Sequence, residues 1–594
     1  MQLSKEQQQK LQKLGVTTLS ELALLIPSSC EDYTISQTLH PQTYQVIDAT
    51  IESVYRAPNS LQITFFAHNF GHQIHGVIFK PKPYMLHAFS VGSREYFYGL
   101  VTCKMGQCSI SMPKKITQVG KITPKYKTAL RNDVMCRLVA ELLTKENLLA
   151  EGLKEEIVDA VLKLHFPTVL PPKELSEDAL YAMKYLELFY YLKSLAKKRR
   201  YFKPLVSQQS SYGAWEKTLP FTLTPEQKKA IEDIKEDFGK DVAARRMVVG
   251  DVGSGKTMVI LAAAFMMLPH RSILMAPTTI LANQLFEEAQ KFLDIKIALV
   301  TNKSKKEDLN GYDLIIGTHA LLYRELPEAA LVMVDEQHRF GTQQRNRLEK
   351  LVSCGERKPH YLQFSATPIP RTQAMIESAH IDVSLITSTP FKKDIETQVI
   401  HREDFQELLQ HIRSEIAKNN QVLLVYPLVE QSDVLEYQSI DEARGYWEKN
   451  FENVYVTHGK DKEKEEVLLS FRENGSILLA TTVVEVGISL PRLTIVVIVG
   501  AERLGLATLH QLRGRVSRTG LKGYCYLYTN QKEPQRLEEF AKVTNGFEIA
   551  NLDLKYRKSG DLLRGEHQSG SQFKYIDFAL DEEIVQKVKK DLLV

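Results

Sequence analysis

One eight-residue segment constrains the fold of this chain more than any other. Residues 250–257 read Gly-Asp-Val-Gly-Ser-Gly-Lys-Thr, which matches the phosphate-binding pattern G-x-x-x-x-G-K-[ST]. An apolar stretch at 247–249 precedes the segment, and an apolar run at 258–267 follows it. This order predicts a strand, a glycine loop and a helix, whose backbone N–H groups together form an anion site. The segment therefore predicts an α/β domain that binds a nucleoside triphosphate.

The same segment predicts how the nucleotide is held. Lys256 is expected to reach the β and γ phosphates, and Thr257 to ligate Mg²⁺ through its hydroxyl. The loop residues expected around the phosphates are Gly250, Asp251, Gly253, Ser254, Gly255, Lys256 and Thr257.

Apolar strands and helices alternate along the chain from residue 221 onward. The expected strands are 247–249, 272–275, 297–300, 314–316, 331–334 and 361–364, followed by 421–425, 453–456, 477–480, 495–499 and 523–528. Such alternation is typical of parallel sheets covered by helices on both faces. The pattern predicts two sheets of this kind, and only the first carries a phosphate loop.

The chain before residue 216 has a different texture. A Leu/Ile pattern predicts helix over residues 1–35, and five short runs at 46–54, 61–66, 74–79, 95–103 and 108–112 predict strands. Five strands in so short a stretch favour a small β-barrel of the oligonucleotide-binding type, although a compact sandwich would look similar. A helical linker with a long helix from residue 181 to 200 follows the barrel.

The expected domains are a helical segment (1–35), a barrel (36–126), a helical linker (127–215), two α/β domains (216–395 and 396–545) and a C-terminal region (546–594). A chain of 594 residues is long enough for about three to five domains. No apolar run approaches the length of a membrane span, and residues 1–13 are polar, so a soluble cytoplasmic protein is expected. The six scattered cysteines are expected to be reduced, buried thiols.

Charge is distributed unevenly. The net charge is only +4, but residues 36–128 carry ten basic residues against three acidic ones. That excess suits a module that contacts phosphate, and a solvated face explains it equally well. The basic run at 197–200 leaves the same two interpretations open, with a solvated helix end favoured.

Two carboxylates end a predicted strand of the first sheet. Asp335 and Glu336 follow the apolar run 331–334, so they are expected at the carboxyl end of a parallel strand near the phosphate loop. Asp335 is expected to hold Mg²⁺, and Glu336 to polarise the water that attacks the γ-phosphate.

A pair of arginines in the second α/β domain predicts the other half of the site. The segment 511–518 runs from Gln511 through Arg515 to Arg518, and arginines three apart on a helix lie on one face. A planar guanidinium suits the charge that develops on the γ-phosphate. We therefore expect Arg515 and Arg518, together with Gln511, to complete a site that lies between the two α/β domains and closes during hydrolysis.

Taken together, these segments resemble superfamily 2 helicases, and specifically the RecG branched-DNA helicases. The resemblance rests on residues 250–257, 276–279, 317–319, 335–341, 364–371, 480–487 and 501–518. Segments at 14–22, 165–167 and 547–554 extend it over essentially the whole chain. It implies two tandem RecA-like motor domains, an oligonucleotide-binding-type wedge, ATP and Mg²⁺ as cofactors, and an ATP-dependent helicase for recombination and repair.

The resemblance also implies residue roles and partners. Phe221 and Gln227 are expected to contact adenine, and Pro277, Thr278, Thr318 and Thr482 to grip the DNA backbone. Arg557 falls in an expected C-terminal translocation hairpin. The implied substrate is branched double-stranded DNA such as stalled forks, Holliday junctions and R-loops. Single-stranded-DNA-binding protein as a further partner, a monomer, and a bacterial nucleoid location are expected as well.

Several positions depart from the family pattern. Residues 27–33 lack the usual arginines after the first helix, and Ser489 stands where an Asp is usual. The hairpin, read at 557–560 and 564–570, is one residue longer than usual, and the chain is short for the family, which suggests a trimmed wedge. One rival is a Mfd-type transcription-repair motor, which would need a polymerase-binding domain and greater length. Another is a non-catalytic junction binder, which the complete set of catalytic residues disfavours.

Overall fold

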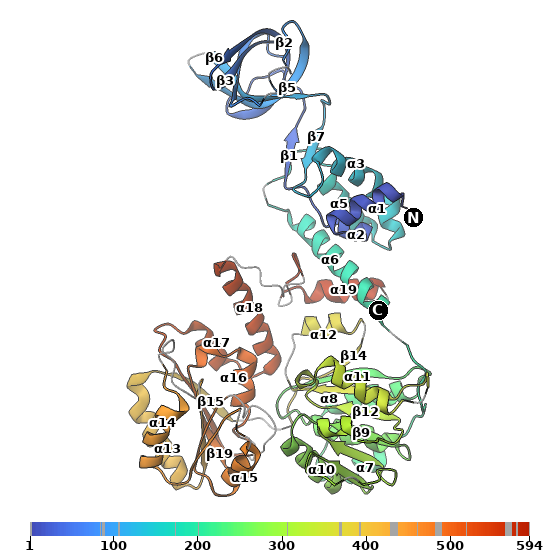
Figure 1. The fold of residues 1–594 in the computed structure, drawn as a ribbon, viewed down its shortest axis with the longest axis vertical. Helices are drawn as coiled ribbons and strands as arrows, with labels where there is room; N and C mark the ends of the chain where they lie inside the picture. Colours follow the sequence, from blue (N-terminus) through green and yellow to red (C-terminus); the bar gives the residue numbers. More distant parts are fainter. Residues whose placement is uncertain are drawn as a thin grey trace. The chain divides into compact units, whose positions relative to one another are not determined.

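A computed structural model describes residues 3–592 except 83–84, 86–88, 105–106, 173, 200, 306, 354, 367–370, 380, 391–393, 428–436, 460, 462, 482–489, 518–519, 565–572 and 578–579. The chain forms two compact units. Figure 1 labels its helices and strands. Unit 1 contains Met1–Tyr191, Phe573–Ile576 and Lys590–Leu593, and unit 2 contains Leu192–Gln572 and Asp577–Lys589.

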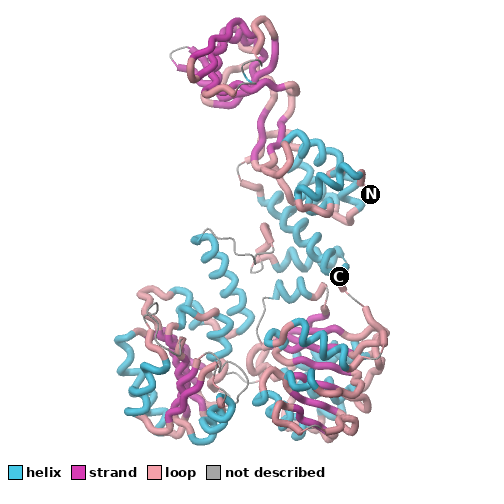
Figure 2. The backbone as a smooth tube through the Cα atoms, viewed as in Figure 1, coloured by secondary structure: helices cyan, strands magenta, loops and turns pink. Residues whose placement is uncertain are grey.

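The barrel of unit 1 is closed and has five strands, drawn in magenta in Figure 2. Its strands are β2 (Thr43–Ala57), β3 (Ser60–Ala67), β4 (His72–Phe79), β5 (Arg94–Lys104) and β6 (Gln107–Ile116), in the order β2-β3-β4-β6-β5. Side chains alternate inward and outward, so that Leu61, Ile63 and Phe65 on β3 fill the core. Closure through the parallel pair β4–β6 confirms a barrel rather than a sandwich.

Aromatic residues divide between the inside and the outside of this barrel. Phe65 and Phe89 are core residues, and Phe66 and Phe70 are half-buried. Tyr84, another aromatic of interest, lies outside the described residues. Three further aromatics, Tyr44, Tyr55 and Phe79, are at least 60% exposed.

Helices and one pair of strands make up the rest of unit 1, and the helices are shorter than expected at its start. The elements are α1 (Lys5–Leu14), α2 (Leu19–Ala23), α3 (Asn132–Leu142), α4 (Lys145–Ala150), α5 (Glu155–His165) and most of α6 (Glu177–Lys198). The expected helix over 1–35 is broken because Gly15, at φ +70°, ends α1 and a capping box on Thr18 begins α2. Strand β1 (Ser29–Asp32) then pairs with β7 (Ile122–Lys125). The long helix expected at 181–200 is confirmed as α6.

The prediction that all cysteines are reduced is wrong for one pair. Cys103 and Cys108 form a disulfide. They lie directly opposite each other on the antiparallel strands β5 and β6, with Cα atoms 4.1 Å apart. This cross-strand register, which the spacing alone did not reveal, brings the two sulfur atoms together.

The first sheet of unit 2 has seven parallel strands in the order β10-β11-β9-β12-β13-β8-β14. Its elements are α7 (Gly213–Glu216), α8 (Pro225–Phe238), β8 (Arg245–Gly250), α9 (Lys256–Met267), β9 (Ser272–Met275), α10 (Thr279–Phe292), β10 (Ile297–Val300), β11 (Leu314–Gly317), β12 (Leu331–Val334), α11 (Thr342–Leu351), β13 (His360–Ser365), α12 (Arg371–Glu377) and β14 (Asp382–Ile386), with 3-10 helices η2 (His319–Tyr323) and η3 (Gln337–Arg339). The six expected strands are present. Strand β14 was not expected, because polar residues interrupt its apolar pattern.

The second sheet has six parallel strands in the order β15-β20-β19-β16-β18-β17. Its elements are β15 (Ile395–Ile400), η4 (Arg402–Asp404), α13 (Phe405–Ala417), β16 (Gln421–Val425), α14 (Ile440–Asn450), β17 (Val454–Thr457), α15 (Lys464–Asn474), β18 (Ile477–Ala480), β19 (Leu493–Val499), η6 (Ala501–Arg503), α16 (Leu506–Arg513), β20 (Gly523–Tyr528) and α17 (Gln535–Lys542). Edge strand β15 alternates polar and apolar residues and was missed for that reason.

Two further helices, α18 (Gly546–Arg564) and α19 (Glu582–Leu592), follow the second sheet. Helix α18 includes residues 557–564, where the first part of a hairpin was expected, and the rest of that hairpin falls in 565–572, outside the described residues. Among the residues that the structure describes, no helix is long and apolar enough to cross a membrane. The two parallel α/β sheets and the barrel confirm the predicted fold class.

Candidate active site

The phosphate loop has the backbone shape that its glycines predict. Gly253 and Gly255 have φ values of +82° and +76°, in the left-handed region that favours glycine. A Cβ atom on Gly250 would collide with the Ser254 hydroxyl. The Lys256 ammonium donates to the carbonyls of Gly250 (2.9 Å) and Asp251 (3.1 Å), so it lies over the loop.

Gln227 supports this loop from outside. Its Nε2 donates to the Ser254 carbonyl at 2.7 Å, and its Oε1 accepts from the backbone N–H of Thr224 at 2.8 Å, within the capping box of α8. The side chain is buried, and a Cβ on Gly255 would collide with it. Phe221 is 40% exposed and meets Phe292 edge to face. Their contact with adenine stays a prediction.

The two acidic residues lie at the carboxyl end of the first sheet. Asp335 directly follows β12, and β13 lies between β12 and β8, the strand that leads into the phosphate loop. Burial and the neighbouring charge of Glu336 raise the pKa of Asp335 to about 7, although the charge of Lys256 opposes the shift. Glu336 has φ +48° and accepts a hydrogen bond from the N–H of Ala366, just after β13, at 3.2 Å. This strained backbone aims Glu336 across the strand ends.

The arginine segment of the second sheet meets the phosphate loop. A Cβ atom on Gly514, at the end of α16, would lie only 2.8 Å from Cγ1 of Val252 in the loop. Glycine at this position therefore permits the close approach of α16. Gln511 on α16 and Arg515 directly after Gly514 are both buried. Arg518 lies outside the described residues.

A buried hydrogen-bond chain crosses the same contact, and the sequence did not predict it. Asp251 accepts from the N–H groups of Val252 (2.6 Å) and Gly546 (2.9 Å) and from Nε2 of His510 (2.5 Å). Arg513 donates to Nδ1 of His510 at 3.1 Å, and since a guanidinium only donates, Nε2 carries the proton shared with Asp251.

These hydrogen bonds keep the Asp251 side chain in its charged form. Burial raises the pKa of Asp251, but the His510 contact and the backbone N–H donors outweigh burial and lower it overall. Arg513 is itself buried, with its guanidinium 4.3 Å from the centre of the Phe540 ring. Burial lowers the pKa of Arg513. No local pattern signals these contacts, because the loop position of Asp251 can hold any residue.

Three of the expected DNA-contacting residues follow strands of the first sheet. Pro277 and Thr278 follow β9, and Thr278 caps α10 by accepting from the N–H of Leu281 at 3.2 Å. Thr318 follows the neighbouring strand β11, is buried, and accepts from the N–H of Ala320 at 3.3 Å. Thr482 and the side chain of Arg557 lie outside the described residues. Their contacts with DNA stay predictions.

The residues at the strand ends fit a hard cation. Asp335 is a buried carboxylate, and burial disfavours its charged form. A divalent cation would compensate that negative charge. Thr257 lies in the first turn of α9 and offers a hydroxyl oxygen. No cluster of three His, Cys, Asp or Glu side chains suited to a metal occurs in the described part of the chain, so bound phosphate would have to supply further oxygens.

Comparison with known proteins agrees with this geometry. The DEAD/DEAH box helicase family matches residues 224–376, and the helicase conserved C-terminal domain matches residues 402–520. The chain is 44% identical to the ATP-dependent DNA helicase RecG of Helicobacter pylori, over 98% of this chain and 97% of that protein. It is 33% identical to RecG of Streptococcus pneumoniae, over 98% and 93%.

A solved structure agrees as well. A structure of RecG bound to a three-way DNA junction is similar over 99% of this chain and 84% of that chain, with a TM-score of 0.55 and 28% identity. The matched segments contain both halves of the site, the phosphate loop with its acidic strand end and the arginine segment. The chain therefore belongs to the RecG family of ATP-dependent DNA helicases.

Proposed function

We propose that this helicase translocates on double-stranded DNA and acts on branched DNA, including stalled forks, Holliday junctions and R-loops, in recombination and repair. The observation that carries the proposal is the contact of α16 with the phosphate loop, through Gly514 against Val252 and His510 against Asp251. Because residues of both sheets meet at the loop, ATP hydrolysis can be coupled to movement of one sheet against the other.

The residues of the site take the following proposed roles. Lys256 and the loop N–H groups bind the phosphates, Glu336 accepts a proton from the attacking water, and Arg515 and Arg518 stabilise charge on the γ-phosphate. Gln511 orients the reacting groups. Asp335 and Thr257 would hold Mg²⁺, which would neutralise negative charge on the nucleotide phosphates.

The remaining proposals concern DNA and partners. The three-way junction bound by the RecG relative supports a branched substrate here, with the barrel as the wedge. Pro277, Thr278, Thr318, Thr482 and Arg557 would contact the DNA backbone, which suits a motor that acts on any sequence. We propose a monomer that works at the bacterial nucleoid with single-stranded-DNA-binding protein, and the domain division 1–35, 36–126, 127–215, 216–395, 396–545 and 546–594.

DNA-stimulated ATP hydrolysis tests the proposal, measured with three-way and four-way junctions and with a plain tailed duplex. We expect stimulation and unwinding to be greatest with the junctions, and a Lys256→Ala variant to lose both. Equal unwinding of junctions and plain duplex by the unaltered protein would contradict the branched-DNA assignment. ATP hydrolysis that Lys256→Ala leaves unchanged would contradict the site itself.

A further inference from the structure

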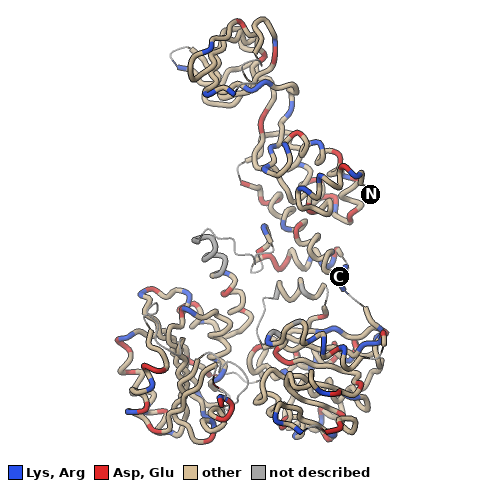
Figure 3. Tube along the Cα trace, in the orientation of Figure 1, with Lys and Arg blue, Asp and Glu red and all other residues tan. Residues whose placement is uncertain are grey.

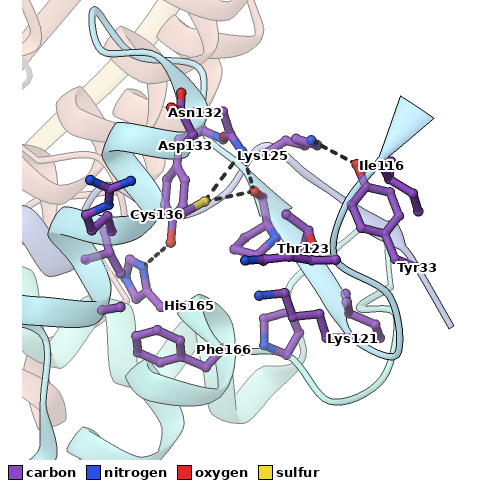
Figure 4. Close-up of a pocket in the computed structure, with 18 of the residues that line it drawn as sticks. Tyr33, Ile116, Lys121, Thr123, Lys125, Asn132, Asp133, Cys136, His165 and Phe166 are labelled. Carbon is purple, nitrogen blue, oxygen red and sulfur yellow. Dashed lines mark hydrogen bonds between the residues drawn. The ribbon is translucent and has the colours of Figure 1, made fainter. Parts of the chain in front are cut away.

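A cavity of about 920 Å³ lies in unit 1, outside the closed barrel. Its lining comes from Tyr33 just after β1, from the end of β6, from β7, from most of the length of α3, and from the end of α5 with the residues that follow it. In Figure 4, Tyr33 stands on one side of the cavity, and His165 and Phe166 stand on the other. None of these residues belongs to the ATP site.

The lining is rich in positive charge. Figure 3 marks Lys and Arg in blue on one of the two segments between the barrel and the helices of unit 1, and Asp and Glu in red on the other. Six cations line the cavity: Lys114, Lys115, Lys121, Lys125, Arg131 and Arg137. Three carboxylates pair with four of them: Glu31, Glu95 and Asp133. Three positive charges are therefore left in excess.

Two cations are especially available to a ligand. Lys121 and Arg137 are exposed, and within the described ranges of the chain neither forms an ion pair, although the charge of Arg137 attracts that of Glu6 on α1. Little negative charge is available to the other lysines, because the single carboxylate of Glu31 pairs with both Lys125 at 2.6 Å and Lys114 at 3.4 Å. Burial, and then the charge of Lys125, lower the pKa of Lys114, while Glu31 opposes the shift. An anion in the cavity would relieve this repulsion.

One aromatic face is open beside these charges. Phe166 is 42% exposed, whereas Tyr33 and Tyr126 are buried. His165 cannot serve as a ligand, because Tyr126 donates its hydroxyl to Nδ1 at 2.9 Å and Nε2 donates to the carbonyl of Ala23 at 2.9 Å. These hydrogen bonds hold His165 and Tyr126 in place, and Phe166 directly follows His165 in the chain. Basic side chains beside an exposed aromatic ring are the features that bind single-stranded nucleic acid.

We propose that this cavity binds a single strand of DNA, with its phosphates against Lys121 and Arg137 and one base stacked on Phe166. The inference rests on the proposed function, since the strand would be an arm of the branched substrate. A free mononucleotide offers the same phosphate and base chemistry. The strand is favoured because the cations lie on several elements, from β7 to α3, and thus extend along the lining.

Salt dependence of binding tests the phosphate contacts. A fluorescent dT oligonucleotide is titrated, without ATP, into the full chain and into a Lys121→Ala/Arg137→Ala variant. Each phosphate contact to a single strand contributes about 0.7 to the slope of log K against log salt, so the slope should fall by about 1.4 and affinity at 0.1 M salt by about 25-fold. A Lys5→Ala/Lys13→Ala variant, which removes two exposed lysines of α1, should keep both values.

A second probe reports on the cavity even if the double variant fails to fold. In a Phe166→Trp protein, the oligonucleotide should quench the new fluorescence, and dTMP should do so only at much higher concentration. Quenching by dTMP as tight as that by the oligonucleotide, or no quenching, would overturn the proposal. So would an unchanged salt slope in a folded double variant.

These outcomes are separable from those of the proposed function. If the unaltered protein shows junction-stimulated ATP hydrolysis while the cavity variants bind DNA as it does, only the cavity assignment is wrong. If junctions fail to stimulate hydrolysis, the proposed function is wrong, and quenching of the Phe166→Trp protein then shows a strand site without a motor.

Discussion

At the scale of single residues, Asp251 connects the phosphate loop to two elements distant in sequence. It accepts from His510 on α16 and from the N–H of Gly546 at the start of α18. The buried carboxylate accepts hydrogen bonds from the loop, from α16 and from the start of α18. A shift of any one of these segments would therefore disturb its hydrogen bonds. We infer that His510 positions the loop through its contact with Asp251.

We expect His510→Ala to slow DNA-stimulated ATP hydrolysis about tenfold, because it leaves Asp251 buried without its side-chain donor. His510→Gln offers an N–H at a similar place and should restore most of the rate. The exposed His270 provides a matched control, and His270→Ala should hydrolyse ATP at the normal rate. Steady-state turnover with and without junction DNA measures the effect, and equal rates for His510→Ala and the unaltered protein would refute it.

His165 gives unit 1 a predictable dependence on pH. Burial lowers its pKa from the ordinary 6.5 to about 4, although the hydrogen bond to Ala23 opposes the shift. The folded state favours the neutral ring. The contribution of His165 to the stability of unit 1 is therefore fully present above pH 6.5 and is lost as pH falls toward 4. The loss should reach up to about 3 kcal/mol.

Denaturant unfolding of the full chain between pH 4 and pH 7, followed through unit 1, measures this dependence. His165→Gln removes the titrating group, so its stability should vary less with pH over the same window. A variant curve as steep as that of the unaltered protein would assign the acid sensitivity to other groups.

At the scale of elements, the barrel exposes aromatics where its strands turn. Tyr55 lies near the end of β2, and Phe79 pairs with Ser60 at the start of β3, so both belong to the β2–β3 end of the barrel. They are 66% and 60% exposed. Exposed apolar rings at a strand end suit the separation of stacked bases.

We expect Tyr55→Ala/Phe79→Ala to reduce junction unwinding about tenfold, from the loss of about one base-stacking contact. Junction-stimulated ATP hydrolysis should change little, because the ATP site lies in unit 2. Tyr44 is the matched control, since it is 60% exposed but stacks on Tyr98 with ring centres 5.6 Å apart. Normal unwinding by the double variant, measured by gel or fluorescence, would place the wedge tip elsewhere.

The packing of α16 on the phosphate loop also explains why glycine is required at position 514, which the sequence motif alone does not explain. Gly514 ends α16 where its neighbour is Val252, so a larger side chain would push α16 away from the phosphate loop. Steric access, rather than backbone freedom, requires glycine here, since its φ of −66° suits any residue.

At the scale of the whole molecule, we expect nucleotide binding to change the stability and hydrogen exchange of unit 2 and to leave the barrel of unit 1 unchanged. A non-hydrolysable ATP analogue at 100 times its Kd should stabilise unit 2 by about 2.7 kcal/mol. Hydrogen exchange should slow in residues 250–267 and 506–515, because both line the proposed site. Exchange in the barrel should stay unchanged, since the barrel lies in unit 1. Protection confined to 250–267 would mean that α16 takes no part in nucleotide binding.

Much of the architecture followed from the sequence alone. The glycine pattern, the acidic strand end and the alternation of apolar runs are local signals, because each depends on residues a few positions apart. They predicted both sheets, the barrel and the loop, and they missed the strands β1, β7, β14 and β15 and the Cys103–Cys108 disulfide.

Tertiary structure alone decided the contacts between distant segments. His510 and Asp251 are 259 positions apart, and the basic cavity gathers side chains from residue 33 to residue 167. Such pairings depend on which distant elements pack together, and no local pattern in the sequence records that choice. The sequence by itself determined that the chain binds a nucleotide within an α/β motor, and the packing of α16 on the loop decided which residues hold that site together.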